Sequence, residues 1–317
     1  MNNLSTKYNG RSNETFPFKI NFFKANNNSI SDLIQQNDFD NKNKNIIFIN
    51  NKNNDNNFDS VQSSETEYYF ECDKKSNFGI KKWKDGSKFL GLFQNNLANG
   101  WGIFVHHDSE IFRGKFENNQ ANGYGEYIHK NGFINIGYWE NDLQKGFGYE
   151  IMGDSCFYFG EFSKGKKNGI GTYKWSDNTK YEGEIKDNFF HGYGIYIYED
   201  GRIFTGQWNQ NHINGFGEMI WMEGNKYVGF YKNDKKDGFG IYYFPPDKFY
   251  IGFWKKGKQE GYGKYVYNNK IKYGIWKNGK IRKKFENERF FYNDLKLNNI
   301  EISLYQLDIN KIKSDLI

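Results

Sequence analysis

The stretch that decides the fold is residues 181–194, YEGEIKDNFFHGYG. An aromatic residue stands two positions before a glycine, a spacer follows, and a Gly-x-Gly ends the stretch. Counterparts of the first glycine recur every 23 residues, at Gly91, Gly114, Gly137, Gly160, Gly183, Gly206, Gly229 and Gly252. The Gly-x-Gly recurs in the same register, from Gly100 and Gly102 to Gly261 and Gly263. A fixed period of this length is typical of an array whose units bury their apolar faces against their neighbours.

Within one unit the apolar residues alternate, which indicates β-strands. Phe89, Gly91 and Phe93 share one face of a strand, a loop over residues 95–99 follows, and Trp101, Ile103 and Val105 alternate on the next strand. Turn signals separate successive units, at Asp85-Gly86, Asn131-Gly132, Asp200-Gly201 and Glu223-Gly224. Each unit is therefore predicted to be a β-hairpin, and the array an elongated, single-layer antiparallel meander of the all-β class.

Three sets of aromatic side chains accompany the glycines. The first set precedes the first glycine, at Phe112, Tyr158, Tyr181, Phe204, Tyr227 and Tyr250. The second follows it, at Phe116, Trp139, Phe162, Trp208, Tyr231 and Trp254. The third lies inside Gly-x-Gly, at Trp101, Tyr124, Phe147, Tyr193, Phe216, Phe239 and Tyr262, with Ile170 as the exception. Because glycines at i and i+2 leave a trough in which a ring can lie against backbone, all three sets are predicted to be core.

This pattern resembles the MORN (membrane occupation and recognition nexus) repeat, whose unit is similar to Tyr-x-Gly, a spacer and Gly-x-Gly. The best-matching copies are 181–194 and 227–240, and the resemblance covers residues 83–280 as eight full repeats and a partial one. Asn135 and Ile185 depart from the ring positions, and the partial copy, residues 273–279, is interpreted as a terminal cap. The resemblance implies an all-β array with a binding role. Similar proteins occur in radial spoke heads and in the cytoskeleton beneath membranes, and the family name points to phosphoinositide membranes.

The segments outside the array carry weaker patterns. Residues 66–82 are predicted to be a degenerate capping repeat, and the Asn-rich residues 1–65 to be disordered. Residues 281–317 are interpreted as a C-terminal cap or self-association segment. There Ile300, Ile302 and Leu304 alternate like a strand, whereas Ile300, Leu304 and Leu307 suit a helix, so both alternatives stay open.

Catalytic patterns are not found in the sequence. The five histidines are scattered, Cys72 and Cys156 lie far apart, and no Gly-x-Gly extends to a nucleotide-binding motif. No insertion interrupts the repeat to build a pocket. We therefore expect no enzyme activity, no catalytic residues, no metal site and no cofactor. The Met1-Asn2-Asn3 start and the lack of a long apolar run favour a soluble, cytoplasmic protein.

Charge is distributed unevenly along the array. Residues 226–284 carry 16 Lys and Arg against 4 acidic residues, whereas residues 81–225 carry 15 against 18. Nine lysines are expected to form a basic loop edge: Lys235, Lys236, Lys255, Lys256, Lys258, Lys277, Lys280, Lys283 and Lys284. Loops of successive hairpins would lie about 10 Å apart, close enough for their fields partly to add. Solvated surface lysines are the simpler interpretation of the same residues.

Two functions follow as hypotheses. In the first, the chain is a non-catalytic scaffold for cytoskeletal or axonemal proteins, at the cytoskeleton, in a cilium or flagellum, or at the inner face of a membrane. In the second, the basic repeats bind anionic lipids such as phosphoinositides. Nucleic acid is not expected as a partner, because the rings are committed to packing and Arg is scarce in the basic part. Homodimerisation through a chain end is compatible with an open meander, whose edge strands are unpaired.

Overall fold

The computed structural model describes residues 58–63, 68–268 and 270–300, which form 21 strands and one helix. The strands of the described part are β1 (Phe58–Ser63), β2 (Tyr68–Asp73), β3 (Phe78–Trp83), β4 (Lys88–Gln94), β5 (Leu97–Val105), β6 (Ile111–Glu117), β7 (Gln120–Ile128), β8 (Ile134–Glu140), β9 (Leu143–Ile151), β10 (Phe157–Ser163), β11 (Lys166–Lys174), β12 (Lys180–Lys186), β13 (Phe189–Ile197), β14 (Ile203–Asn209), β15 (His212–Ile220), β16 (Lys226–Lys232), β17 (Lys235–Phe244), β18 (Lys248–Lys255), β19 (Lys258–Tyr267), β20 (Lys270–Lys277) and β21 (Lys280–Phe285). The helix is α2 (Glu288–Leu297).

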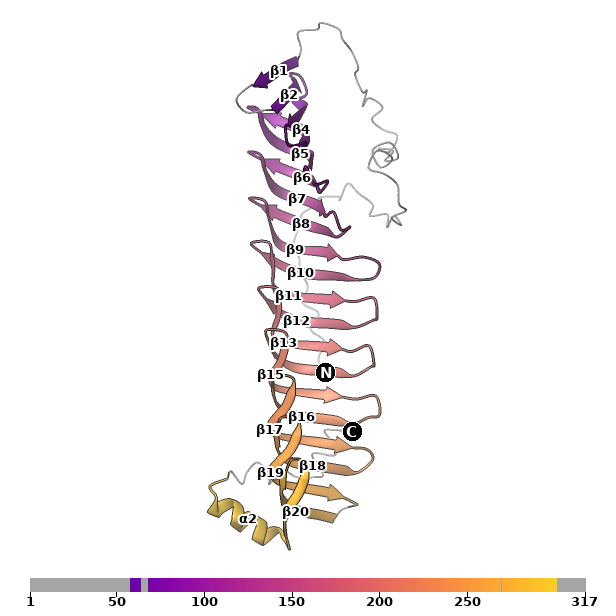
Figure 1. Ribbon diagram of the computed structural model, residues 1–317, viewed down its shortest axis with the longest axis vertical. Coiled ribbons are helices and arrows are strands. Elements are labelled where there is room, and N and C mark those ends of the chain that lie inside the picture. Colours follow the sequence, from indigo (N-terminus) through magenta and orange to yellow (C-terminus); the bar gives the residue numbers. More distant parts are fainter. Residues whose placement is uncertain (1–57, 64–67, 269, 301–317) are drawn as a thin grey trace, which may run out of the picture. The chain divides into compact units, whose positions relative to one another are not determined.

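All 21 strands belong to one sheet, and each pairs antiparallel with the strand that follows it in the chain. The strands lie side by side in a single layer (Figure 1). This confirms the predicted all-β meander of hairpins.

Two kinds of connection alternate along the sheet. Within a unit the turn has two residues, such as Asn95 and Asn96, whose φ angles are +52° and +60°. A two-residue hairpin turn of this kind needs left-handed backbone at both positions, which Asn adopts more readily than most residues. The expected loop over 95–99 is therefore wrong in length, because β5 already begins at Leu97.

Between units the connection is longer and contains the predicted turn signals. In the loop between β7 and β8, the His129 N–H donates to the Phe133 carbonyl and the Gly132 N–H donates to the His129 carbonyl. Gly86, Gly132, Gly201 and Gly224 all have positive φ. The turns between units are thus confirmed where the sequence placed them.

A row of glycines crosses the sheet and explains the repeat. Gly91 pairs with Gly102, Gly102 with Gly114, and the same pairing continues unit by unit to Gly274. A Cβ added to Gly194 would lie 2.5 Å from the Tyr181 hydroxyl oxygen. The rings of the first set therefore lie directly over glycine backbone, as the aromatic-rescue argument predicts.

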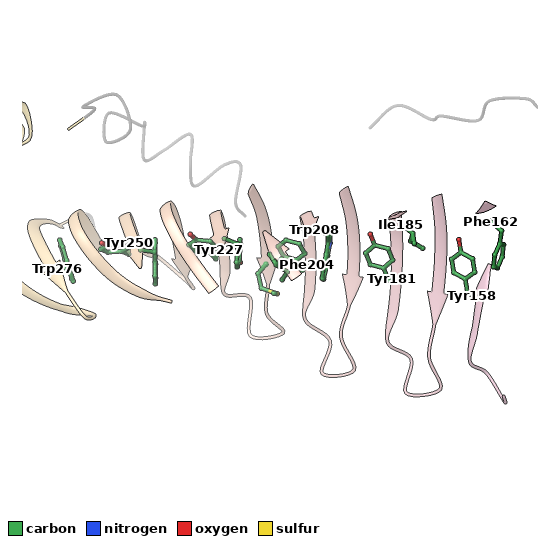
Figure 2. Packing of buried hydrophobic residues seen from close by; sticks show 13 residues of the cluster. Tyr158, Phe162, Tyr181, Ile185, Phe204, Trp208, Tyr227, Tyr250 and Trp276 are labelled. Carbon is green, nitrogen blue, oxygen red and sulfur yellow. The ribbon is translucent and has the colours of Figure 1, made fainter. Parts of the chain in front are cut away.

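The first two ring sets form the core, as predicted. Tyr158, Tyr181, Phe204, Tyr227 and Tyr250 are fully buried. They pack edge-to-face against the second set, with Tyr181 and Trp208 centroids 5.6 Å apart (Figure 2). Such ring pairs stabilise a core beyond the area that they bury.

The third set contradicts the prediction that it is core. Six of its positions, Trp101, Tyr124, Phe147, Ile170, Tyr193 and Phe216, are 37–60% exposed. The second glycine of the Gly-x-Gly lies on the ring face, since a Cβ added at Gly102 would meet Phe89 and one added at Gly194 would meet Tyr181. Successive side chains of a strand point to opposite faces, so the residue before that glycine faces away from the core.

The ends of the sheet differ from the predicted boundaries. At the N-terminal end β1 and β2 add a hairpin that begins at Phe58, before the expected start at residue 66. At the C-terminal end residues 273–279 lie in a further hairpin, formed by β20 and β21. The predicted C-terminal segment is described only to residue 300, so the choice between a strand and a helix over residues 300–307 lies outside the described residues. Most of residues 1–65, which were predicted to be disordered, also lie outside them.

Helix α2 covers the end of the sheet face that carries the third ring set. Its first turn is capped by Asn287, whose side chain accepts a hydrogen bond from the Phe290 N–H. Phe291 and Leu295 are fully buried and pack in one cluster with Phe239, Phe253 and Tyr262 among others. Since Phe239 and Tyr262 belong to the third set, α2 is an example of a helix that packs on this face of the sheet.

Candidate functional site

Two surfaces of the described residues carry the features that a binding protein needs. The first is the row of exposed third-set residues, Trp101, Tyr124, Phe147, Ile170, Tyr193 and Phe216, which we call the aromatic stripe. The second is the turn edge that carries the predicted lysines. Sequence reasoning missed the stripe, although the alternation between the two glycines was the signal that could have found it.

The stripe arises from a bulge at each Gly-x-Gly. In β13 the first glycine, Gly192, has a φ of +57°, and the register shifts between Gly183 and Ile185 of the paired strand. The N–H that follows the bulge is met by a side chain: Tyr193 N donates to a Glu184 carboxylate oxygen at 2.9 Å. In the same way the Ile170 N–H donates to the Glu161 carboxylate and the Phe216 N–H to the Gln207 amide oxygen. The stripe residues are therefore held by a fixed backbone rather than by packing of their side chains.

The neighbours of the stripe vary from unit to unit. Tyr124 faces Tyr138 with ring centroids 5.8 Å apart, and Phe216 faces Phe230 at 5.5 Å. Elsewhere the partner across the strands is polar, as with Trp101 and Lys115. A constant row of apolar groups with variable neighbours suits a protein-binding face, since the first gives affinity and the second gives selectivity.

Beyond the C-terminal end of the stripe, the third-set residues Phe239 and Tyr262 are covered by α2. The Tyr262 hydroxyl donates to an Asp294 oxygen at 2.6 Å, and the Lys283 ammonium donates to the other oxygen at 2.8 Å. Burial and the Asp294 carboxylate raise the pKa of Tyr262 to about 12. Lys283 and Tyr262 hold the pKa of Asp294 below its usual range. Hydrogen bonds and buried apolar groups thus fix the helix to the sheet face that carries the stripe.

Most of the predicted basic residues lie together at one edge of the sheet. Lys255 and Lys258 face each other across the turn between β18 and β19, and Lys277 faces Lys280 across the next within-unit turn. Seven are exposed and have no carboxylate within 4.0 Å among the described residues: Lys235, Lys255, Lys256, Lys258, Lys277, Lys280 and Lys284. Lys283 is exposed but paired with Asp294.

Lys236 departs from the other predicted edge residues. Its ammonium lies 4.1 Å from the centroid of Tyr242 and 4.9–5.1 Å from those of Trp221, Tyr227 and Trp254. Burial lowers the pKa of Lys236 to about 8. Its side chain points into the core face rather than toward solvent at the edge, because it is the second residue of β17 and alternation places it on the ring side.

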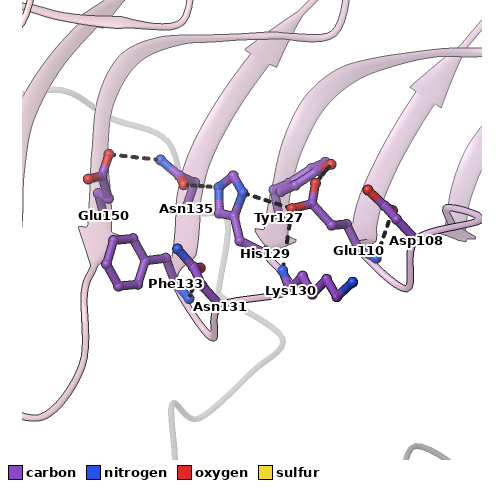
Figure 3. Close-up of polar contacts among 9 residues, drawn as sticks. All are labelled: Asp108, Glu110, Tyr127, His129, Lys130, Asn131, Phe133, Asn135 and Glu150. Atoms are coloured by element: carbon purple, nitrogen blue, oxygen red, sulfur yellow. Dashed lines mark hydrogen bonds and ion pairs between the residues drawn. The ribbon is translucent and has the colours of Figure 1, made fainter.

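A polar network interrupts the ring core at the third unit (Figure 3). Asn135 stands where other units carry a ring, and its side chain accepts from His129 Nε2 at 2.8 Å and donates to Gln144 at 3.1 Å. The network continues from Glu150 to the Lys167 ammonium at 2.8 Å. All these groups find partners, which is what makes a buried polar side chain tolerable.

The described residues contain no group of three or more His, Cys, Asp or Glu side chains that could hold a metal ion. His212 lies at a within-unit turn, where its Nδ1 is 2.6 Å from Asp234. None of the helices among the described residues is long and apolar enough to span a bilayer.

The comparisons agree with this geometry. The MORN-repeat family model matches residues 112–133, 158–180, 181–201, 204–226, 227–247 and 250–271. The chain belongs to the MORN-repeat family. Two further hairpins with the same glycine pattern, β4–β5 and β8–β9, lie outside the residues that the family model matches. In the hairpin β8–β9, Asn135 stands in place of a ring.

No curated protein matches the sequence. Among solved structures, the chain is similar to the TCP domain of SAS-4 (dCPAP) of Drosophila melanogaster in complex with a proline-rich motif of Ana2. The identity is 7%, the TM-score is 0.24, and 59% of this chain and 84% of that chain are covered. The G-box domain of the microcephaly protein CPAP is 10% identical with a TM-score of 0.27, over 69% of this MORN chain and 99% of that chain. Likenesses at this level carry no argument about function.

Proposed function

We propose that this MORN array is a non-catalytic scaffold that binds an amphipathic helix of a partner protein along the aromatic stripe. The observation that carries the proposal is the row of exposed apolar side chains on a fixed backbone, which continues into units where the chain's own helix α2 covers the same face. A partner helix with apolar residues on one face would bury the uncovered units in the same way.

The proposed partners are cytoskeletal or axonemal proteins, and the proposed location is the cytoplasm, at the cytoskeleton, in a cilium or flagellum, or beneath a membrane. An array with many equivalent sites can hold several components at fixed spacing, which is the task of a scaffold.

The test replaces Phe147, Tyr193 and Phe216 together by Ser. These side chains are exposed, so we expect the thermal unfolding midpoint to change little. We expect the variant to lose partner proteins that wild type retains in a detergent-insoluble cytoskeletal fraction. The control is Met222→Ser, which removes an exposed apolar side chain from a loop outside the stripe. An unchanged set of partners in the triple variant would contradict the proposal.

A second function, binding to anionic lipid, is favoured by the exposed lysines at the turn edge, such as Lys255, Lys256 and Lys258, which have no carboxylate within 4.0 Å in the part of the chain that the structure describes. Charge reversal of Lys255, Lys256 and Lys258 to Glu should abolish sedimentation with phosphoinositide liposomes at physiological salt. The matched control reverses Lys115, Lys130 and Lys164, which are exposed residues in the acidic part of the array. Equal loss in both variants would show only a response to net charge.

Self-association through a chain end is proposed at the β1 end. The other terminal strand, β21, reads KIRKKF, and its four cations disfavour pairing with a second copy.

A further inference from the structure

A second group of buried apolar side chains lies on the face of the sheet that carries the aromatic stripe. Tyr243, Phe249, Ile251 and Val266 are 0–7% exposed, and we call them the Ile251 cluster. Tyr243 stands four residues after the third-set residue Phe239 in β17, so both side chains point to the same face. The register places Phe249 opposite Tyr243 and Val266 opposite Phe249. Alternation along β18 then places Ile251 on this face as well.

Equivalent positions in other units are open to water. Ile203, two periods before Phe249, is 36% exposed. Leu90 and Phe159 stand seven and four periods before Ile251, and they are 43% and 38% exposed. Because the strand pairing repeats from unit to unit, neighbouring strands alone do not bury these positions. The Ile251 cluster therefore has a cover that the other units lack.

The burial of Lys264 shows that this cover also extends over a charged residue. Lys264 faces Ile251 across β18 and β19 and is 4% exposed, although Tyr149 and Ile195 at the same position are 43% and 40% exposed. A lysine on a sheet face normally extends its ammonium into water. Burial lowers the pKa of Lys264, and the carboxylate of Glu288 acts in the opposite direction. Atoms above the sheet are needed to bury this side chain, and Glu288 at the start of α2 is one source of them.

Helix α2 covers the adjoining part of the face and not the Ile251 cluster itself. Its buried residues, Phe291 and Leu295, pack in a cluster with Tyr273. The side chains that pack against the Ile251 cluster are Phe239 and Ile241, and both belong to β17. Phe239 is common to the two clusters, so they lie side by side. Within the part of the chain that the structure describes, no apolar residue outside the strands joins the Ile251 cluster.

The described residues end next to this surface. Ile300 packs against the cluster that α2 forms, and its N–H donates to the Leu295 carbonyl at 3.0 Å. The 17 residues that follow, 301–317, read EISLYQLDINKIKSDLI and are nearly half apolar. A chain of this length reaches about 25 Å even as a helix, whereas the three strands of the Ile251 cluster are only about 10 Å across. The residues before Phe58, in contrast, join the sheet at β1, at its opposite end (Figure 1).

We propose that residues 301–317 dock over the Ile251 cluster, beside α2, and close the last units of this face to other proteins. Apolar residues such as Leu304 and Leu307 would replace water over the cluster. The acidic residues Glu301, Asp308 and Asp315 suit a surface that contains a buried lysine. The aromatic stripe lies in earlier units and stays open, so this inference does not depend on the function proposed above.

The first test compares hydroxyl-radical oxidation of the purified full chain with that of a variant that ends at Ile300. In the full chain we expect slow oxidation of Tyr243 and Phe249. In the shortened variant their oxidation should become several-fold faster, because the cluster loses its cover. Phe159 and Tyr149 are exposed internal references whose rates should be equal in both proteins. Unchanged protection of Tyr243 and Phe249 in the shortened variant would overturn the proposal.

The matched control removes residues 1–54 instead of residues 301–317. It should leave the oxidation of Tyr243 and Phe249 as slow as in the full chain. Faster oxidation in this variant would assign the cover to the N-terminal segment. Fast oxidation in the purified full chain would assign it to a separate partner protein. Either result would contradict the proposal.

A second measurement keeps the segment in place, so it does not depend on how the shortened variant folds. The full-length variant Leu307→p-benzoylphenylalanine is photo-cross-linked in a mixture of light-isotope and heavy-isotope chains. We expect cross-links from position 307 to residues 235–267, each within a single chain. Cross-links between light and heavy chains would identify a second copy as the cover. Cross-links to other parts of the array alone, or none, would place the segment away from this face, and each of these results would refute the proposal.

Discussion

Single residues decide how the rings meet the sheet. The hydroxyl groups of Tyr158, Tyr181, Tyr227 and Tyr250 each donate to the carbonyl three residues ahead. In Phe204 the same ring position carries no hydroxyl. A buried hydroxyl without a hydrogen-bond partner costs stability, so these carbonyls are part of the ring site.

This difference predicts opposite effects for two conservative changes. Tyr181→Phe should lower the free energy of unfolding by about 1 kcal/mol, because it removes a hydrogen bond to the Glu184 carbonyl. Phe204→Tyr should leave it unchanged or raise it by a similar amount. Chemical denaturation of both variants measures the two values. An unchanged free energy of unfolding in Tyr181→Phe would show that the hydroxyl makes no contribution.

Lys236 predicts a dependence of stability on pH. Its pKa is about 8 in the folded chain and 10.5 without burial, so between these values the unfolded chain binds more protons. The free energy of unfolding should therefore rise from pH 8 to about pH 10, by up to about 3 kcal/mol before the ring contacts, which favour the charged form, are subtracted.

The measurement is urea denaturation at pH 7.5 and pH 10 for wild type and Lys236→Met. The wild type should gain stability relative to the variant as pH increases, since the other titrating groups are common to both. A constant difference between the two proteins would contradict the assigned burial of Lys236.

At the scale of elements, residues of the within-unit turns link each hairpin to the one before it. The second residue of a turn bonds to the second residue after the turn of the preceding unit: the Asn119 side chain accepts from the Ala98 N–H at 2.8 Å, and the Asn119 N–H donates to the Ala98 carbonyl at 3.0 Å. This explains the recurrence of Asn and Asp at the turns, where one residue must adopt positive φ and supply an acceptor.

Helix α2 predicts a local change when its anchor is removed. Leu295→Ala should lower stability by about 2–4 kcal/mol for the terminal hairpins, because Leu295 is fully buried against the sheet. Hydrogen exchange should become faster in α2 and β20–β21 and stay unchanged in β4–β9. Uniform acceleration along the chain would show that the array unfolds as one unit.

At the scale of the whole described sheet, the core is not continuous. One ring cluster includes Phe89 to Trp139 and another runs from Met152 to Ile281, and the network of Asn135, Gln144 and Lys167 lies between them. Since repeat arrays are stabilised by contacts between neighbouring units, a polar junction weakens the coupling between the two halves.

The polar junction predicts unfolding in two steps. Hydrogen exchange at increasing denaturant should release the amides of β4–β7 and those of β10–β19 at different concentrations. In the double variant Asn135→Tyr with Gln144→Ile the two concentrations should move closer, because apolar side chains replace the buried amides. A single concentration for both halves of the wild type would contradict this interpretation.

Much of this protein follows from its sequence alone. The 23-residue period, the turn signals and the first two ring sets predicted the meander and its core, because strand alternation and turn geometry are local properties of the chain. The resemblance to MORN repeats rested on the same residues.

Tertiary structure decided the rest. The exposure of the third ring set depends on which face the paired glycines turn toward the rings, and the position of Lys236 depends on four rings contributed by three strands and a loop. The covering of Phe239 and Tyr262 by α2 joins residues far apart in the chain. Contacts of this kind are set by packing between strands and between distant segments, and no periodicity within a single unit records them.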